Sequence, residues 1–349
     1  MVKIMKKYSR TVLFGGLLAG MCLMGISAAG CQTKTDIKQE TKQETETKKK
    51  TETEQNTEEE QKTETEQKTY TFTDDLERTV TVEHADRVAV LNASYADIWN
   101  LAGGLESIVG ASDNTWTDID IELPETVVNL GTTNEISLEK LIACDPDLVI
   151  ASADMGQNVD QMAAYEEAGL TVAYFSVTTF DEYLHMLKIC TDITGKEENY
   201  ETWGNALKEQ VESALARADG SRPKVLYVRA TSGGVKVKNS KGSVLGQMLS
   251  DLDCINIADS EESLMEKLSM EVILQEDPDF IFAIYMGNDT ASIEEVMDSV
   301  LFSNPAWNTL SAVKEDHFYI MDNSLYNLKP NARWGEAYEK LARILYPQQ

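Results

Sequence analysis

The chain has 349 residues, of which 42% are apolar, enough for two modest domains or one large one with a packed core. Its formal net charge of −28 argues against nucleic acid as a partner, because phosphate binding needs clustered Lys and Arg side chains. The same charge is compatible with docking onto a basic protein surface.

The first 30 residues have the pattern of a targeting segment. A basic start (residues 3–10) is followed by an apolar run (13–26) that is shorter than the about 20 residues needed to span a membrane. The run closes with "AAGC", in which small residues precede Cys31 as they do where a lipoprotein signal peptidase cuts. We expect residues 1–30 to be removed and Cys31 to carry a lipid. The alternative is an ordinary secretory signal, with Cys31 left as a chance thiol.

Residues 31–69 consist almost wholly of Thr, Lys, Glu and Gln. Such a composition cannot bury enough apolar surface to offset the entropy of ordering the chain. We therefore expect a disordered tether between the lipid and a folded body, with a charged interaction tail as the alternative. Beyond it, Cys144, Cys190 and Cys254 form no C-x-x-C pair, so they are expected to be buried thiols.

The folded body is expected to begin at residue 70. The stretch "YTFTDDLERTVTV" (70–82) alternates on both sides of a polar turn, which predicts a β-hairpin. After it, short β-branched runs alternate with helical stretches, and this alternation predicts parallel-rich sheets with helices on their faces. The predicted strands are residues 88–91, 108–111, 148–151, 172–175, 225–228, 280–283 and 318–321.

A helical region (179–220) separates two such α/β segments, 70–178 and 221–349. Thr179 and Glu182 have capping-box spacing, and Gly195 is placed to end the helix that they begin. A second helix, from about residue 197 to 218, carries one apolar stripe and predicts a strut. The fold class predicted is therefore α/β, with two lobes whose central sheets are parallel-rich, joined by one long rigid helix.

One pattern occurs twice, as "SLEKLIACDPDL" (137–148) and "SMEVILQEDPDF" (269–280). In each copy, Ser is a plausible N-cap, the Glu two residues later falls in the first helical turn, and Asp-Pro-Asp stops the helix before a buried strand. The repeat predicts two similar lobes. Glu139 and Glu271 have one explanation within the fold, since a carboxylate near a helix N-terminus gains about 0.3–1 kcal/mol from the helix dipole.

Taken together, these motifs resemble the substrate-binding lipoproteins of iron-siderophore, haem and cobalamin ABC importers. The resemblance runs from the hairpin at residue 70, through "DRVAVLNASYADIWNLAGGLESIVGAS" and the two repeats, to the final helix "NARWGEAYEKLARIL". Glu77 departs from it, because the family usually has Gly in that hairpin turn. The resemblance implies a helix-linked periplasmic-binding-protein fold. It also implies that Glu139 and Glu271 each pair with an Arg on one of two permease subunits.

A ligand is expected in the cleft between the lobes, where loops follow the carboxyl ends of the strands. Aromatic side chains there would line the walls, and Arg side chains would bind carboxylate, catecholate or phosphate oxygens. Core packing is the alternative for each aromatic residue, and a plain surface charge is the alternative for the Arg that opens the last helix. The candidates for ligand binding are Tyr95, Trp116, Arg229, Tyr285 and Arg333, with Trp334 as a further aromatic.

The expected cargo is a ferric chelate of the siderophore type, and no intrinsic cofactor is expected. A bare metal site is not favoured, because the spacing of His84, His185 and His317 does not bring them together. Thr133 and Ser152 stand where cobalamin binders tend to have Trp, which weakens the cobalamin reading. Haem, cobalamin or another small ligand remain alternatives.

No nucleophile–base–orienter set and no phosphate-binding loop occur, so the chain is not expected to be an enzyme. A non-transport surface-binding lipoprotein is the competing class. We expect an exported monomer on the outer face of the cytoplasmic membrane, held there by its lipid alone, which delivers a small ligand to the permease of an ABC importer.

Overall fold

The computed structural model describes residues 69–287 and 289–347. The predicted signal peptide, Cys31 and all but the last residue of the predicted tether lie outside these described residues. No helix within them is both long and apolar enough to cross a membrane.

The first lobe is built on a five-stranded parallel sheet with the order β5-β4-β3-β8-β9. Four of its strands match the predicted runs, and all of the β3 and β8 side chains are buried. Two small antiparallel pairs accompany the sheet, the predicted hairpin β1–β2 and the pair β6–β7. The strands are β1 (Tyr70–Thr73), β2 (Thr79–Val82), β3 (Val88–Val90), β4 (Ile108–Ala111), β5 (Val128–Asn129), β6 (Gly131–Thr132), β7 (Glu135–Ile136), β8 (Leu148–Ser152) and β9 (Val172–Phe175).

Helices connect the strands of this lobe, as a parallel sheet requires. The longest, α6, begins at the predicted capping box, where Thr179 and Glu182 bond to each other's backbone N–H, and ends at Gly195 with φ 67°. The helices are α2 (Ala93–Leu101), η1 (Leu105–Ser107), η2 (Asp113–Trp116), α3 (Leu138–Ala143), α4 (Gly156–Asp160), α5 (Met162–Glu167) and α6 (Phe180–Thr194).

The second lobe has a five-stranded sheet in which β11-β10-β13-β14 are neighbours and β12 also pairs with β10. The three predicted strands are present and parallel, while β10 and β11 form an antiparallel hairpin that the sequence analysis did not predict. The strands are β10 (Lys224–Thr231), β11 (Gly234–Lys238), β12 (Ile255–Asn256), β13 (Phe280–Tyr285) and β14 (Phe318–Met321). The helices are α9 (Val244–Asp251), η4 (Ile257–Asp259), α10 (Ser263–Glu266), α11 (Met270–Glu276), α12 (Thr290–Met297), η5 (Asp298–Phe302), η6 (Pro305–Thr309), α13 (Ser311–Lys314), α14 (Asn323–Tyr326), η7 (Asn331–Arg333) and α15 (Trp334–Leu345).

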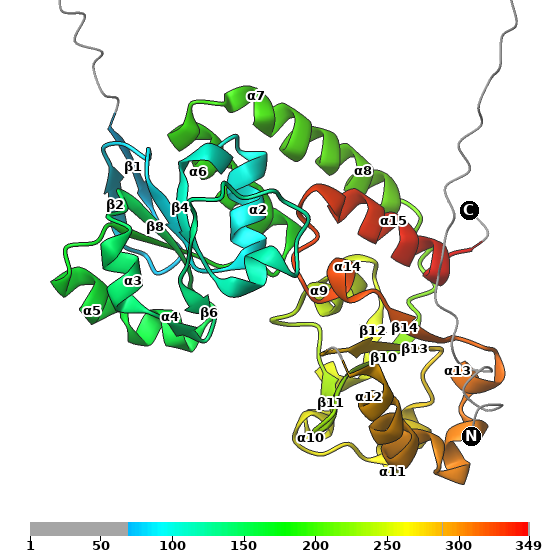
Figure 1. Ribbon diagram of the computed structural model, residues 1–349. Coiled ribbons are helices and arrows are strands. Elements are labelled where there is room, and N and C mark those ends of the chain that lie inside the picture. The colour runs from blue at the N-terminus through cyan, green and yellow to red at the C-terminus, as the bar shows by residue number, and fades with distance from the viewer. Residues whose placement is uncertain (1–68, 288, 348–349) are drawn as a thin grey trace, which may run out of the picture. The chain divides into compact units, whose positions relative to one another are not determined.

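The predicted strut exists as one helical run made of α7 (Glu197–Tyr200), η3 (Glu201–Asn205) and α8 (Ala206–Leu215). Two of its features were not part of the prediction. Its middle segment, η3, is a π-helix, and the Tyr183 hydroxyl donates a hydrogen bond to the Trp203 carbonyl there at 2.8 Å. It is also not a free rod, because the last helix, α15, packs along α8 (Figure 1). Gly335 permits this approach, since a Cβ at that position would lie 2.2 Å from the Gln210 side-chain oxygen.

One hydrophobic core extends from the first lobe through the strut into the second lobe. At its centre, the Trp334 ring of α15 lies 5.7 Å from the Phe180 ring and 6.2 Å from the Tyr183 ring of α6. The Asn331 amide adds a polar link, since its nitrogen donates to the Ser94 carbonyl and to an Asp97 carboxylate oxygen, both at 2.8 Å. Chain segments far apart in the sequence therefore hold the two lobes together.

The β1–β2 hairpin is fastened to β9 by a buried carboxylate, that of Asp74. One carboxylate oxygen accepts the N–H groups of Leu76 and Arg78, and the other accepts two N–H groups of the Arg78 guanidinium and the backbone N–H of Tyr174. The Arg78 side chain also donates to the Val172 carbonyl at 2.6 Å and lies over the Tyr174 ring. The hairpin is thus an integral part of the first lobe.

The turn of this hairpin contains Glu77 at φ 59°, the left-handed region that favours glycine. We expect Glu77→Gly to raise the free energy of unfolding by about 1 kcal/mol, because relief of the left-handed strain outweighs the greater entropy of an unfolded glycine. Chemical denaturation would measure the change. Glu122→Gly is the matched control, since Glu122 is exposed and is not among the residues with positive φ. A destabilised Glu77→Gly protein would contradict the expectation.

The three cysteines of the folded body, Cys144, Cys190 and Cys254, are buried and free, as predicted. Burial raises the pKa of the Cys190 thiol and raises that of Cys254 to about 12. These thiols therefore pack as small apolar side chains.

Candidate functional site

The repeated motif forms the same structure in both lobes. Ser137 caps α3 by accepting the Lys140 N–H at 3.3 Å, and Ser269 caps α11 by accepting the Val272 N–H at 3.5 Å. After each helix, the first Asp of Asp-Pro-Asp takes a left-handed conformation and turns the chain toward the buried strand. The predicted helix–turn–strand unit is thus confirmed twice.

The second Asp of each motif has a structural role. Asp147 accepts the Arg87 N–H at 2.9 Å, and Asp279 accepts the Lys224 N–H at 2.8 Å. In return, the two basic side chains donate to carbonyl groups at the ends of the motif helices, Arg87 to Asp145 at 2.8 Å and Lys224 to Glu276 at 3.3 Å. The Ser and Asp positions of the repeat are therefore explained by the fold of each lobe.

The repeated Glu is not explained in the same way. Glu139 on α3 and Glu271 on α11 are exposed, each in the first turn of its helix. In the described part of the chain, neither carboxylate makes a hydrogen bond or an ion pair. Two carboxylates in matching places on matching lobes are therefore available to a partner.

Three of the predicted ligand-binding residues lie at or beyond the carboxyl-terminal ends of strands, in accessible positions. Trp116 ends η2, which follows β4, and its side chain is 44% exposed. Arg229 and Tyr285 lie near the ends of the neighbouring strands β10 and β13 and are half-buried. The Arg229 guanidinium donates to the Tyr227 hydroxyl at 2.7 Å, and burial raises the pKa of Tyr285.

The structure does not place Tyr95 on the cleft surface. Its side chain is fully buried, and its hydroxyl donates to the Phe175 carbonyl at 2.9 Å. Trp334 is also fully buried, in the aromatic cluster of the interlobe core. For both residues, core packing is the structural role, because α2 and α15 turn these faces inward.

Arg333 is exposed but already paired. Its guanidinium makes two bonds to the Glu336 carboxylate, at 2.6 and 3.1 Å, one turn further along. This partner raises the pKa of Arg333, and the pairing lowers that of Glu336 to about 2. Arg333 also borders an interlobe cavity of about 310 Å³, although its positive charge is already paired with the Glu336 carboxylate. The other lining residues are Asp97, Asp118, Ile119, Asp120, Ser324, Leu328, Lys329, Pro330 and Ala332.

Lys329 is a residue that the sequence analysis missed. Burial lowers the pKa of its ammonium group, and the charge of Arg229 in the second lobe lowers it further. The carboxylates of Asp154 and Glu182 in the first lobe act in the opposite direction and raise it. Its ammonium group makes no hydrogen bond or ion pair with the described residues. In the sequence it is a single Lys before Pro330, with no pattern to mark it.

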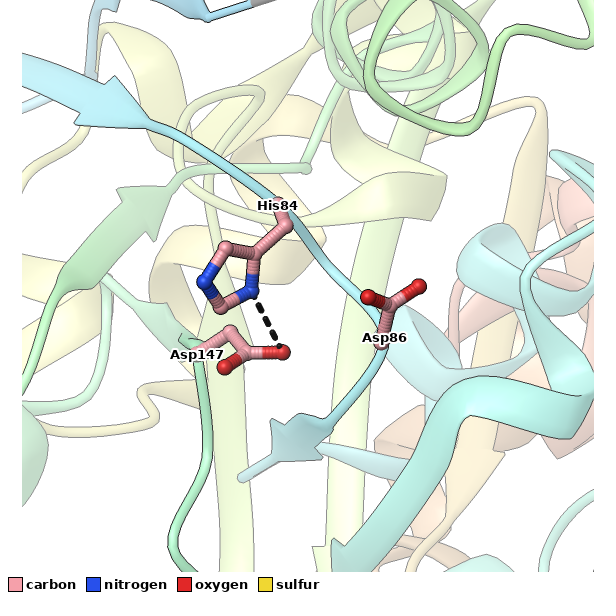
Figure 2. A group of neighbouring side chains, drawn as sticks. All are labelled: His84, Asp86 and Asp147. Carbon is pink, nitrogen blue, oxygen red and sulfur yellow. Dashed lines mark ion pairs between the residues drawn. The ribbon is translucent and has the colours of Figure 1, made fainter. Parts of the chain in front are cut away.

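The three histidines lie apart, as predicted, each beside its own carboxylate. His84 Nδ1 is 3.0 Å from Asp147, His185 Nε2 is 3.6 Å from Asp75, and His317 Nδ1 is 3.7 Å from Glu315. Figure 2 shows the first pair with Asp86, and one possible metal-ligand atom of each residue lies within 4.8 Å of the others. Asp147 also accepts the Arg87 N–H at 2.9 Å.

Two α/β lobes joined by a helix, with polar loops at the strand ends between them, define the class of two-lobed solute-binding proteins. The family model described as periplasmic binding protein matches residues 88–325, and the chain belongs to that family.

Relatives within this class are named for different ligands. An iron-uptake system-binding protein of Bacillus subtilis (strain 168) is 25% identical over 274 residues, which cover 77% of this chain and 79% of that protein. A cobalamin-binding protein of Halobacterium salinarum (strain ATCC 29341 / DSM 671 / R1) is 26% identical over 263 residues, 72% of this chain and 69% of the relative. The solved siderophore-binding protein BauB, bound to ferric iron and two acinetobactin molecules, shares the fold with a TM-score of 0.63. Its identity is 17%, and the match covers 79% of this chain and 99% of that one.

Members of this family are substrate-binding proteins of ABC transporters and are not enzymes, which confirms that expectation from the sequence. Such proteins work with permease subunits, and one relative, from Bacillus subtilis (strain 168), is named a putative ABC transporter substrate-binding lipoprotein. It is 25% identical over 275 residues, which cover 74% of this chain and 82% of that protein.

Proposed function

We propose that this chain is an extracytoplasmic lipoprotein that captures a ferric chelate between its lobes and delivers it to the permease of an ABC importer. The observation that carries the proposal is the matched pair of exposed carboxylates, Glu139 and Glu271, on equivalent helices of the two lobes. Two equivalent contacts suit a partner that presents two subunits.

The proposed contacts are ion pairs between these carboxylates and Arg side chains of the permease. A single exposed ion pair contributes only about 0–1 kcal/mol. Two pairs on separate lobes fix the orientation of the bound protein and speed its encounter with the permease. Neither carboxylate is paired with a residue in the described ranges 69–287 and 289–347, which supports this role, because docking then breaks no bond seen there.

A ferric chelate is the proposed cargo, supported by the iron-uptake relative and by the basic side chains Arg229 and Lys329 in the interlobe region. Guanidinium and ammonium groups bind the anionic oxygens that ferric chelates carry. The cobalamin-binding relative supports cobalamin as the second candidate.

The cargo is tested by titrating the lipid-free mature protein with ferric chelates, haemin and cyanocobalamin while tryptophan fluorescence is recorded. Saturable sub-micromolar binding of a ferric chelate, on the order of −8 kcal/mol or stronger, is the expected result. If only haemin or only cyanocobalamin binds with saturation, the cargo is haem or a corrinoid, respectively, and not a ferric chelate. If no ligand in the panel changes the tryptophan fluorescence, and the protein also fails to associate with a permease, the transport function itself is contradicted.

Anchoring gives a separate prediction. If Cys31 carries the lipid, a Cys31→Ser protein will leave the membrane fraction, because the substitution removes the thiol to which the lipid is attached. Cell fractionation and mass spectrometry of the mature N-terminal peptide measure this. A Cys144→Ser protein, which also lacks one thiol, should fractionate as the wild type does. A membrane-bound Cys31→Ser protein, with no lipid adduct on the wild type, would contradict anchoring through Cys31.

A further inference from the structure

One face of the β10–β11 hairpin carries an unusual concentration of positive charge. Arg229 of β10 lies directly opposite Lys236 of β11, and Tyr227 lies opposite Lys238. Side chains alternate between the two faces of a strand, so these four residues share one face. Val237, which alternates with them, packs into the core of the second lobe on the opposite face.

This face borders the interlobe region. Tyr227 belongs to the core that runs through both lobes, so the face that it shares is the one turned toward that core. Lys329, from the loop after α14, lines the interlobe cavity of about 310 Å³, and the Arg229 guanidinium contributes to lowering the pKa of its ammonium group. We call Arg229, Lys236, Lys238 and Lys329 the basic cluster.

The basic cluster is not neutralised by the protein. Among the described residues, no ion pair joins any of its four members to a carboxylate. The Arg229 guanidinium donates to the Tyr227 hydroxyl instead. By contrast, Arg87, Lys224 and Arg333 bond to carbonyl or carboxylate oxygens of the protein.

Two carboxylates of the first lobe act on one member of the basic cluster, Lys329, and each also accepts hydrogen bonds within its own lobe. Asp154 and Glu182 of the first lobe attract Lys329, but Asp154 accepts the Ser176 hydroxyl at 2.6 Å, and Glu182 accepts N–H groups of Thr178 and Thr179. Burial, together with the nearby Arg229 and Lys236, also lowers the pKa of Lys238. Lys236 is exposed, but Arg229, Lys238 and Lys329 are half-buried. Mutual repulsion of half-buried cations costs stability, and such costs concentrate at functional sites.

We propose that the basic cluster is an anion-binding subsite that selects negatively charged ferric chelates, with carboxylate or catecholate oxygens, over neutral corrinoids and cationic hydroxamate chelates. The inference rests on the proposed function and names its substrate class. The Arg229 fork binds two oxygens of one planar group, while the three ammonium groups act as point charges around it. An anion here also removes the repulsion within the cluster.

The test compares the lipid-free mature protein with the Lys236→Gln/Lys238→Gln/Lys329→Gln triple variant by isothermal titration calorimetry. The probes are ferric citrate and a ferric tris-catecholate as anions, ferrioxamine B as a cation, and cyanocobalamin as a neutral corrinoid. We expect an anionic chelate to bind at least about tenfold more tightly than the other probes, and the triple variant to lose at least about tenfold of that affinity.

Lys208→Gln/Lys267→Gln is the control, because both lysines are exposed and lie outside the basic cluster, and it should bind within about twofold of the wild type. Tightest binding by ferrioxamine B or cyanocobalamin overturns the anion subsite but leaves the transport function standing. No binding by either anionic chelate, or an unchanged affinity in the triple variant, also overturns it. Failure of every probe and of permease association would instead contradict the proposed function.

Discussion

Replacing both Glu139 and Glu271 by Lys should abolish cargo uptake while leaving cargo affinity unchanged. In the proposed complex, each substitution turns an attractive contact with a permease Arg into like-charge repulsion, which costs several kcal/mol. A loss of about 3 kcal/mol or more is over a hundredfold in affinity for the permease. Uptake of iron-55 supplied as the bound chelate, measured beside the cargo dissociation constant, separates docking from capture.

A matched control is available in each lobe. Glu167→Lys/Glu295→Lys changes the net charge by the same amount at exposed positions of α5 and α12, outside the repeated motif. This control should keep most of the uptake, because exposed charges far from a contact contribute little. Undiminished uptake by the Glu139→Lys/Glu271→Lys protein would remove these residues from the docking surface.

Loss of the Asp74 carboxylate should have the largest effect on stability. Asp74→Ala leaves the half-buried Arg78 guanidinium and the N–H groups of Leu76 and Tyr174 without their acceptor. Breaking a buried ion pair in this way costs about 3–5 kcal/mol, a large part of a typical domain's stability. Urea denaturation, followed by circular dichroism, should therefore show a much lower transition midpoint.

Two further variants locate the cause of that loss. Asp86→Ala removes an exposed carboxylate from the loop after the hairpin and should change stability by less than about 0.5 kcal/mol. Asp74→Ala/Arg78→Ala should cost much less than the sum of the two single changes, because both remove the same interaction. If Asp74→Ala loses under about 1 kcal/mol, the carboxylate does not fasten the hairpin to β9.

Local signals predicted most of the fold. The seven buried strands and the ends of α6 were predictable because β-branched runs, the Thr179–Glu182 capping box and Gly195 act within a few residues. The repeated motif was readable for the same reason. Its Ser caps and Asp-Pro-Asp turns are local, although the bonds from Asp147 to Arg87 and from Asp279 to Lys224 join distant segments.

The site was less predictable, because it depends on which way side chains face after packing. Tyr95 follows a strand end as a cleft residue would, yet the first turn of α2 directs it into the core. The basic cluster needs the register that places Arg229 opposite Lys236, set by the two-residue turn at Ser232 and Gly233. It also needs the loop after α14 to bring Lys329 into the interlobe region. No local sequence pattern encodes this placement or the strand register.

The helix α15 also has a consequence for how the protein is made. Trp334 and Tyr338 complete the aromatic cluster with Phe180 and Tyr183, yet they come after all of the strands described for the two lobes. The first lobe is contiguous in sequence, so it can fold as a unit once its residues are available. The joint between the lobes must wait for α15. A nascent chain therefore stays incompletely folded until α15 has been synthesised.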